Sequence, residues 1–234
     1  MLRITDLNAY YDQFHVLRQV SCEVREGEMV VLLGPNGHGK STLLKSICGL
    51  VDKVDGAITY KGEEITGWST ERLVNSGVIY IAETRELFGD MTVLENLKLG
   101  AYSKNARKTE KKNLARVFEL FPRLASRKKQ LASTMSGGEA RMLAIARGLM
   151  SNAEFLCIDE PSLGLQPSLR VEVFHIIKEI NRLGKSLLVV EQNIPQIAEM
   201  ADRIYVLEEG CITFDGKTED AAGDDRLKEI FLGM

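Results

Sequence analysis

The chain has 234 residues, of which 44% are hydrophobic and 27% are charged, and its net charge is −3. These values are typical of one ordinary α/β domain, and the net charge gives no general electrostatic attraction to nucleic acid. No apolar run approaches the roughly 20 residues that a membrane-spanning helix requires. We therefore expect a single domain over residues 1–234, whose role at any membrane depends on a partner.

The cysteines are spread along the chain at Cys22, Cys48, Cys157 and Cys211, and none forms a C-x-x-C pair. Cys48 and Cys157 lie in apolar runs, which favours buried, reduced thiols in a cytosolic protein over a disulfide framework. Arg3 also interrupts the N-terminal stretch early, so we expect no secretory leader. The histidines share no metal-ligand spacing, and we predict no metal role for them.

The first predicted elements are two strands. Residues 2–8 alternate apolar and polar side chains and predict an edge strand of an antiparallel sheet, and residues 16–24 repeat the pattern. Tyr10, Tyr11 and Phe14 lie between them. An aromatic ring there can stack on an adenine, but half-buried tyrosines near strand ends are common, so the residues alone leave both interpretations open.

The next elements surround a glycine-rich loop. Residues 29–33 are a buried-strand pattern, and residues 41–50 carry leucine and isoleucine at helical spacing. Between them, GPNGHGKS at residues 34–41 fits the phosphate-binding pattern G-x-x-x-x-G-K-[ST]. Lys40 would reach the β- and γ-phosphates, and the Ser41 hydroxyl would bind Mg²⁺. The residues predicted to contact the nucleotide here are Asn36, Gly37, His38, Gly39, Lys40, Ser41 and Thr42.

The middle of the chain is expected to contain short elements. Residues 56–60 and 77–82 predict strands, residues 69–75 predict a helical turn, and residues 91–99 predict a short helix. These segments alternate between strand and helix patterns, which favours an α/β architecture.

Residues 103–129 differ in character because lysine and arginine are frequent there. Leu114, Val117, Phe118 and Phe121 follow helical spacing, and glutamates are interleaved with the basic residues. A helical subdomain with a solvated basic face is therefore favoured over a nucleic-acid patch. We expect this subdomain to span about residues 84–150.

A second candidate anion site follows. Met-Ser-Gly-Gly-Glu at residues 135–139 stands directly before an amphipathic helix predicted over residues 140–150. A serine and glycines at a helix N-terminus can bind an anion, although the same residues can also serve as a plain helix cap.

Two acids end the next buried strand, residues 155–158. Asp159 can hold Mg²⁺ directly or through water, and Glu160 can polarise an attacking water beside a phosphate loop. A solvated acidic turn is the alternative.

The rest of the chain is expected to contain five further elements. The patterns predict a helix over residues 169–180, a strand over 187–190 with Gln192 just beyond its end, and a helix over 197–201. A hairpin over 204–214 and a terminal helix over 224–232 follow.

Together, the phosphate loop, residues 135–139, the strand-end acids and Gln192 resemble the ATPase subunit of an ABC transporter. The resemblance implies a P-loop NTPase cassette of the α/β class, with a mainly parallel core sheet, an N-terminal antiparallel β subdomain and a helical subdomain. Closer similarity to the LivF-type subunits comes from residues 85–96, 159–165, 190–193 and 231–233. It implies uptake of branched-chain or hydrophobic amino acids, with urea or short amides as the alternative.

The resemblance also implies a dimer in which two ATPase subunits pair head to tail and enclose ATP between them. Tyr11 would stack on adenine beside Val16, and Glu160 would activate the lytic water, with Gln192 at the switch position. Mg²⁺ would be held by Ser41, Glu83 and Asp159. The signature residues Ser136, Gly137, Gly138 and Glu139 would contact the γ-phosphate of the opposite site.

The implied partners are a LivG-type paralogue or a second identical chain, together with transmembrane permease subunits, at the cytoplasmic face of the membrane. Three positions depart from the general pattern. Glu83 stands where a glutamine is usual, Gln192 replaces the switch histidine, and Gln166 replaces an aspartate. An amide can hydrogen-bond a phosphate but cannot carry a positive charge.

Two other classes are less favoured. Non-transport ABC ATPases of DNA repair or translation typically carry two cassettes or a long coiled coil, and this chain has neither pattern. P-loop kinases and GTPases offer no explanation for residues 135–139, and no N-K-x-D guanine-reading motif occurs.

Overall fold

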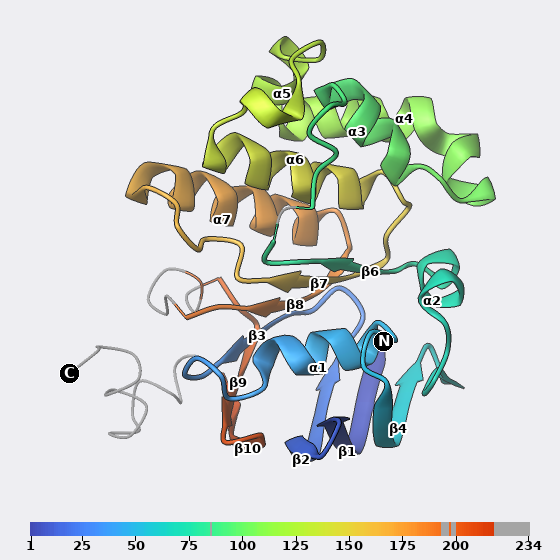
Figure 1. The fold of residues 1–234 in the computed structure, drawn as a ribbon, viewed down its shortest axis with the longest axis vertical. Helices are drawn as coiled ribbons and strands as arrows, with labels where there is room; N and C mark the ends of the chain where they lie inside the picture. The colour runs from blue at the N-terminus through green and yellow to red at the C-terminus, as the bar shows by residue number, and fades with distance from the viewer. Residues whose placement is uncertain (85, 193–196, 198–199, 218–234) are drawn as a thin grey trace.

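A computed structural model describes residues 1–84, 86–192, 197 and 200–217. Their strands form two sheets (Figure 1). The antiparallel sheet has the order β2-β1-β4-β5, and the larger sheet has the order β10-β9-β3-β8-β7-β6. The strands are β1 (Leu2–Tyr11), β2 (Phe14–Val24), β3 (Met29–Leu33), β4 (Lys53–Tyr60), β5 (Glu63–Glu64), β6 (Val78–Ile81), β7 (Phe155–Asp159), β8 (Ser186–Val190), β9 (Arg203–Glu208) and β10 (Cys211–Gly216).

The larger sheet is mainly parallel, as predicted. Strand β3 pairs in parallel with β8 and β9, β7 pairs in parallel with β6 and β8, and β9 pairs with β10 as an antiparallel hairpin. The carboxyl ends of β3, β7 and β8 therefore meet at one edge of the sheet, which is where open α/β sheets bind ligands.

The prediction that residues 2–8 form an edge strand is wrong. Strand β1 lies inside its sheet, because Leu2 has both Val24 of β2 and Tyr60 of β4 as register partners. Strand β4 begins at Lys53, earlier than the pattern suggested, and covers the edge of β1. Both tyrosines predicted to lie in a loop belong to β1, and Phe14 begins β2.

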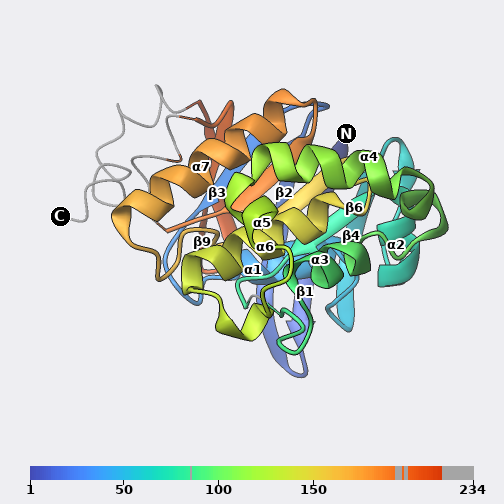
Figure 2. The same cartoon turned by 90° about the horizontal axis from the view of Figure 1, so that it is seen from above.

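The helices form layers on the two faces of the larger sheet. They are α1 (Lys40–Ile47), α2 (Thr70–Ser76), α3 (Val93–Gly100), α4 (Lys104–Leu120), α5 (Pro122–Ser126), α6 (Gly137–Leu149) and α7 (Pro167–Arg182), with a 3-10 turn η1 (Ala132–Thr134). Helix α1 lies between the two sheets, whereas α6 and α7 cover the opposite face and α3, α4 and α5 lie beyond α6 (Figures 1 and 2).

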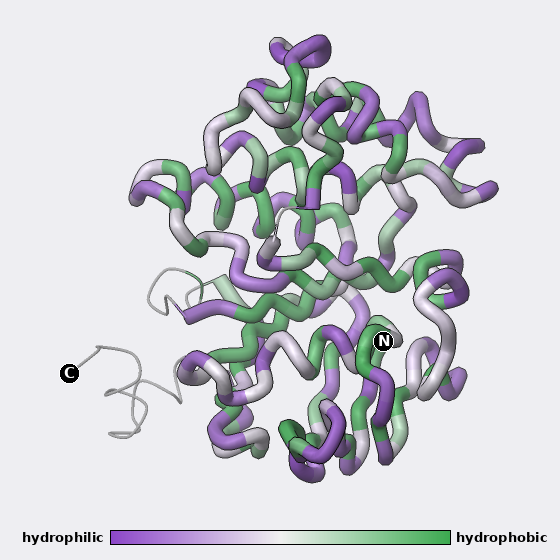
Figure 3. The backbone as a smooth tube through the Cα atoms, viewed as in Figure 1, coloured by the Kyte–Doolittle hydropathy of each residue, from purple (hydrophilic) through white to green (hydrophobic). Residues whose placement is uncertain are grey.

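Strand β3 separates two hydrophobic cores. Its alternate residues Val30 and Leu32 pack with α1 and the antiparallel sheet, whereas Val31 and Leu33 pack with α6 and α7. This division follows from the two-residue period of a strand covered on both faces. Hydrophobic residues accordingly dominate the central strands, and hydrophilic residues gather in the turns and outer helices (Figure 3).

Helix α4 is the most polar of the outer helices. Ala106 and Val117 are buried, whereas Lys104, Lys108 and Lys111 are exposed, as expected for a solvated basic face. None of the helices in the described residues is both long and apolar enough to span a membrane. The helix predicted over residues 224–232 lies outside the described residues, as do residues 198–199 of the one predicted over 197–201.

Candidate functional site

The glycine-rich loop joins β3 to α1 at the carboxyl edge of the larger sheet. Gly39 is the N-cap residue of α1 and has a φ of 103°, a left-handed conformation that glycine adopts without strain. A β-carbon at this position would come within 2.8 Å of Leu17 Cδ2. A larger residue would therefore disturb both the turn and its packing on the antiparallel sheet. The backbone here is shaped to direct amide groups inward, as phosphate binding requires.

Lys40 is held inside this loop. Its Nζ donates hydrogen bonds to the carbonyl oxygens of Gly34, at 2.8 Å, and Pro35, at 2.9 Å, and only 3% of the residue is exposed. Burial lowers the pKa of Lys40, whereas the charge of Glu160, whose Oε1 lies 4.0 Å from Nζ, acts in the opposite direction. The ammonium group is thus fixed at the loop and close to an acid.

Asp159 ends β7 and contacts the loop directly. Its Oδ1 accepts a hydrogen bond from Ser41 Oγ at 3.0 Å, and its Oδ2 accepts one from Tyr80 Oη at 2.8 Å. Burial and the charge of Asp159 raise the pKa of Tyr80 well above its usual value, so the phenol stays a donor. A hydroxyl and a carboxylate oxygen side by side are ligands that suit Mg²⁺. Ser41 and Asp159, both predicted to bind Mg²⁺, are therefore in direct contact.

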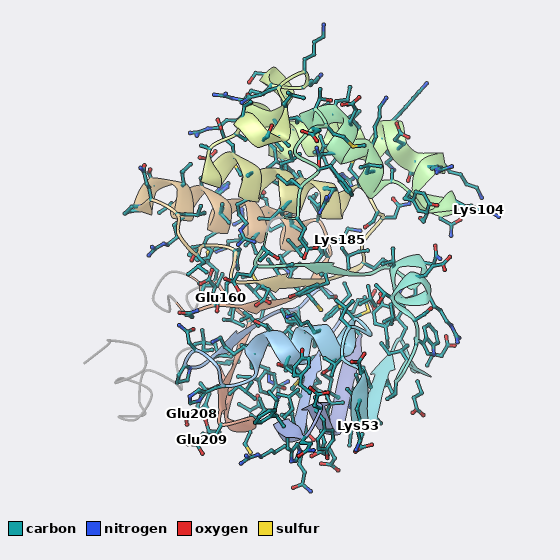
Figure 4. The ribbon with its side chains drawn as sticks, in the orientation of Figure 1. Lys53, Lys104, Glu160, Lys185, Glu208 and Glu209 are labelled. Carbon is teal, nitrogen blue, oxygen red and sulfur yellow. The ribbon has the colours of Figure 1, made fainter. Side chains whose placement is uncertain are left out.

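Glu160 follows Asp159 in an unusual backbone conformation, with a φ of 44°. Its backbone N–H donates to Val190 O at 2.9 Å, which ties the turn to β8. Its carboxylate accepts a hydrogen bond from the Gln192 amide at the end of β8. Strained positions of this kind often occur at active sites. The structure thus joins the two residues predicted to be catalytic. Glu160 is labelled in Figure 4.

Three residues that were not predicted from the sequence support this edge: Arg141 and Glu191 are buried, and Tyr80 is half-buried. Tyr80 orients Asp159, as described above. Arg141 of α6 donates to the carbonyl oxygens of Ala82, Glu83 and Glu160 at 2.8, 2.6 and 3.2 Å. Glu191 accepts from the backbone N–H groups of Ser162, at 2.8 Å, and Gln192, at 3.1 Å. A charged residue inside the apolar pattern of α6 was the available signal for Arg141.

A cavity of about 340 Å³ opens beside the loop. It is polar at its phosphate-loop side and has Leu163 on its wall. The predicted residues that line it are Val16, Asn36, Gly37, Gly39, Lys40, Ser41, Thr42, Glu83, Glu160 and Gln192. Segments from five parts of the chain therefore converge on one cavity.

Tyr11, His38 and Asp159 do not line this cavity. Tyr11 is 38% exposed. The His38 ring accepts a hydrogen bond at Nδ1 from Glu209 N at 3.0 Å, and the His38 carbonyl accepts one from Gly210 N at 3.2 Å. His38 therefore connects the loop to the β9–β10 turn, where Glu209 is labelled in Figure 4.

The second predicted anion site is the N-terminus of α6. Ser136 Oγ accepts from Glu139 N at 3.4 Å, and Glu139 Oε2 accepts from Ser136 N at 3.0 Å, so the two residues form a capping box. The Ser136 N–H holds the pKa of Glu139 below its usual value. The N-termini of α1 and α6 face the same edge of the molecule from opposite sides of the larger sheet (Figure 1). Residues 136–139 do not line the 340 Å³ cavity, so one chain does not close its own site with them.

The sequence is similar to those of known ATP-binding transport proteins. The sequence pattern described as "ABC transporter" matches residues 17–163. The chain is 40% identical, over 100% of both proteins, to the high-affinity branched-chain amino acid transport ATP-binding protein BraG of Pseudomonas aeruginosa. It is 35% identical, over 100% of this chain and 99% of the relative, to the probable branched-chain amino acid transport ATP-binding protein LivF of Archaeoglobus fulgidus.

A solved structure agrees with the fold. The crystal structure of an ATP-binding cassette of an ABC transporter in its ADP conformation superposes with a TM-score of 0.85 at 27% identity. The alignment covers 100% of this chain and 99% of that one.

Proposed function

This chain belongs to the ABC transporter family of ATPases, and from that premise we propose that it powers the uptake of branched-chain or other hydrophobic amino acids. The observation that carries the transport proposal is full-length similarity to BraG and LivF, whose names give that role. The observation that carries the ATPase chemistry is that Lys40, Ser41 and Glu160 line one cavity, while Asp159 accepts a hydrogen bond from Ser41 beside it.

We assign each polar group at this edge a part in phosphoryl transfer to water. The loop amides and Lys40 bind the β- and γ-phosphates and offset their negative charge. Ser41 and Asp159 would hold Mg²⁺, with Glu83 at the cavity wall as a further oxygen donor. When bound, the ion would supply positive charge at the phosphate oxygens. Tyr80 keeps Asp159 oriented through its hydrogen bond.

Glu160 acts as the general base in this proposal. Its carboxylate lies 4.0 Å from Lys40 Nζ, which places it close to the expected position of the terminal phosphate. Gln192 donates to the same carboxylate and so fixes its orientation. An amide in this position binds and orients, but it cannot supply the positive charge of a protonated histidine.

A closed site requires a second subunit. ABC ATPase subunits pair as dimers and join permease subunits, and this chain has its α6 N-terminus on the same molecular edge as its phosphate loop. We propose that Ser136, Gly137, Gly138 and Glu139 of one subunit complete the site of the other, and that Tyr11 and Val16 contact the adenine. The second subunit would be a LivG-type paralogue or an identical chain, at the cytoplasmic face of the membrane.

The decisive variant is Glu160→Gln, which keeps the size and loses the base. We expect ATP hydrolysis to fall by about 10²-fold or more, while ATP still binds and holds the subunits together as a dimer. Turnover is measured by phosphate release, and dimerisation by size-exclusion chromatography with light scattering. Glu64→Gln, at an exposed position in β5, is the matched control. Unchanged turnover in the Glu160 variant would refute the assignment.

The transported solute is tested separately with the complete transporter in membrane vesicles. We expect leucine uptake to require ATP and to stop in the Glu160→Gln transporter. ATP-driven uptake of urea or a short amide in place of leucine would transfer the proposal to that substrate class and leave the ATPase assignment intact.

A further inference from the structure

A second, smaller cavity lies away from the phosphate loop, where α4 passes beside the C-terminal end of α7 (Figure 2). Its volume is about 190 Å³. Helix α4 contributes two cations to its lining, Lys112 and Arg116, and the turn between α7 and β8 contributes a third, Lys185. Lys112 and Arg116 are one helical turn apart and so lie on the same face of α4. Lys185 is labelled in Figure 4 where the helices meet the larger sheet.

The positive charge of this cavity is not balanced from within. Among the described residues that line it, none is acidic, and Lys112, Arg116 and Lys185 form no ion pair in the described part of the chain. The carboxylate with the largest influence on the pKa of Lys185 is Glu154, which raises it and is already paired with Lys61 at 2.5 Å. Burial lowers the pKa of Lys185, and the charge of Arg116 lowers it further. A bound anion would stabilise the charged form of Lys185 against both burial and the repulsion from Arg116.

The rest of the lining has two parts. Its polar wall is a closed network, in which Asn152 Oδ1 accepts from Asn113 Nδ2 at 2.6 Å and from Thr109 Oγ1 at 2.9 Å. These groups hold α4 against the end of α6, and they are occupied with one another. The apolar part of the lining comes from Val117, Leu120, Leu149, Ile180 and Leu183.

We propose that this cavity is a binding site for a small organic dianion that carries a short aliphatic group. The three cations would take two negative charges, and the valine, leucine and isoleucine side chains would cover the aliphatic group. A hollow of this size accepts a small molecule but not a nucleic-acid duplex, so the basic sequence of α4 serves a pocket as well as a solvated surface. The site is separate from the nucleotide cavity and shares no lining residue with it.

The test is isothermal titration calorimetry on the full chain with saturating Mg·ADP, so that the phosphate loop is filled. The probes are 2-isopropylmalate and malate, which carry the same charge and differ in the branched aliphatic group. We expect 2-isopropylmalate to bind about tenfold more tightly than malate because only it covers the apolar lining. Its affinity should fall as salt rises from about 50 to about 500 mM, because salt screens the cations.

Lys185→Gln and Arg116→Gln should each weaken 2-isopropylmalate binding by about tenfold or more, because each removes one unpaired charge. Lys111→Gln is the matched control, since Lys111 is an exposed lysine on α4 next to Lys112 that does not line the cavity. Arg116 is exposed and its loss should not disturb folding, which keeps the test valid if the Lys185 variant is unstable. Binding that disappears when Mg·ADP is present, that is equal for malate, or that falls equally in Lys111→Gln would overturn the proposal.

Discussion

The N-termini of α1 and α6 both carry serine and glycine near an expected phosphate, yet they are built differently. Helix α1 begins after Gly39, and among the described residues no side chain caps it and no acid occupies its first turn. Helix α6 begins after Ser136, and Glu139 already accepts from its N-terminal backbone. A helix N-terminus attracts anions through its free N–H groups and its dipole.

From this difference we infer separate tasks for the two ends. In the proposed site, the uncapped end of α1 binds phosphate together with the ammonium group of Lys40. At the end of α6, the Ser136–Glu139 capping box already satisfies two backbone N–H groups within one chain. We therefore expect α1 to determine nucleotide affinity in the single subunit, and α6 to contribute only when subunits pair.

The largest expected effect comes from Lys40→Ala. Removing the buried ammonium leaves the phosphate charge uncompensated, so turnover should fall by about 10²-fold to 10³-fold and ATP affinity should fall with it. Turnover by phosphate release and binding of a fluorescent ATP analogue to the subunit report these two quantities. Lys45→Ala, in the last turn of the same helix, is the control and should change neither. If ATP affinity survives the loss of Lys40, α1 does not dominate binding.

Ser136→Ala should have a smaller and more selective effect. Ser136 does not line the nucleotide cavity of its own chain, so ATP affinity of the separate subunit should stay unchanged. Turnover of the assembled pair should fall by about tenfold to 10²-fold, because one donor to the opposite phosphate is lost. Analogue binding at low protein concentration and turnover at high concentration separate the two states. An equal loss in both measurements would place Ser136 in its own chain's site and remove the contrast with α1.

Glu139→Gln should give the smallest change, about 0.5 to 1 kcal/mol in the free energy of unfolding at about pH 7. Its folded pKa is lowered from 4.5, so the charge stabilises the fold above that value and ceases to do so as pH falls through the lowered pKa. The difference in thermal stability between wild type and variant should therefore shrink on acidification below about pH 4.5.

The matched control for this pH effect is Glu71→Gln. Glu71 is in the first turn of α2, and the cap described there is Ser69 accepting from Arg72 N, without a reciprocal carboxylate. If the stability difference between wild type and Glu139→Gln does not change with pH, the Glu139 side chain stabilises the fold through packing rather than through its charge.

Local patterns predicted much of this molecule because they depend on neighbouring residues alone. The phosphate loop follows from glycine spacing between a buried strand and a helix, and the mainly parallel core follows from apolar runs that alternate with helical patterns. Local patterns did not predict which strands pair with each other. The pattern of β1 gave no sign that β4 would cover its second edge, since an interior and an edge strand of a half-covered sheet can share one alternation.

By itself, the sequence determined the chemical groups of the site: a lysine and hydroxyl in a glycine loop, two acids after a strand, and an amide after another. Only the tertiary structure decided which of them touch. Tyr80 can hydrogen-bond Asp159 because β6 and β7 are neighbouring strands. Gln192 can hydrogen-bond Glu160 because β7 and β8 are also neighbours. Strand order is set by the packing of both sheet faces and the helices over them, and no short stretch of residues contains that information.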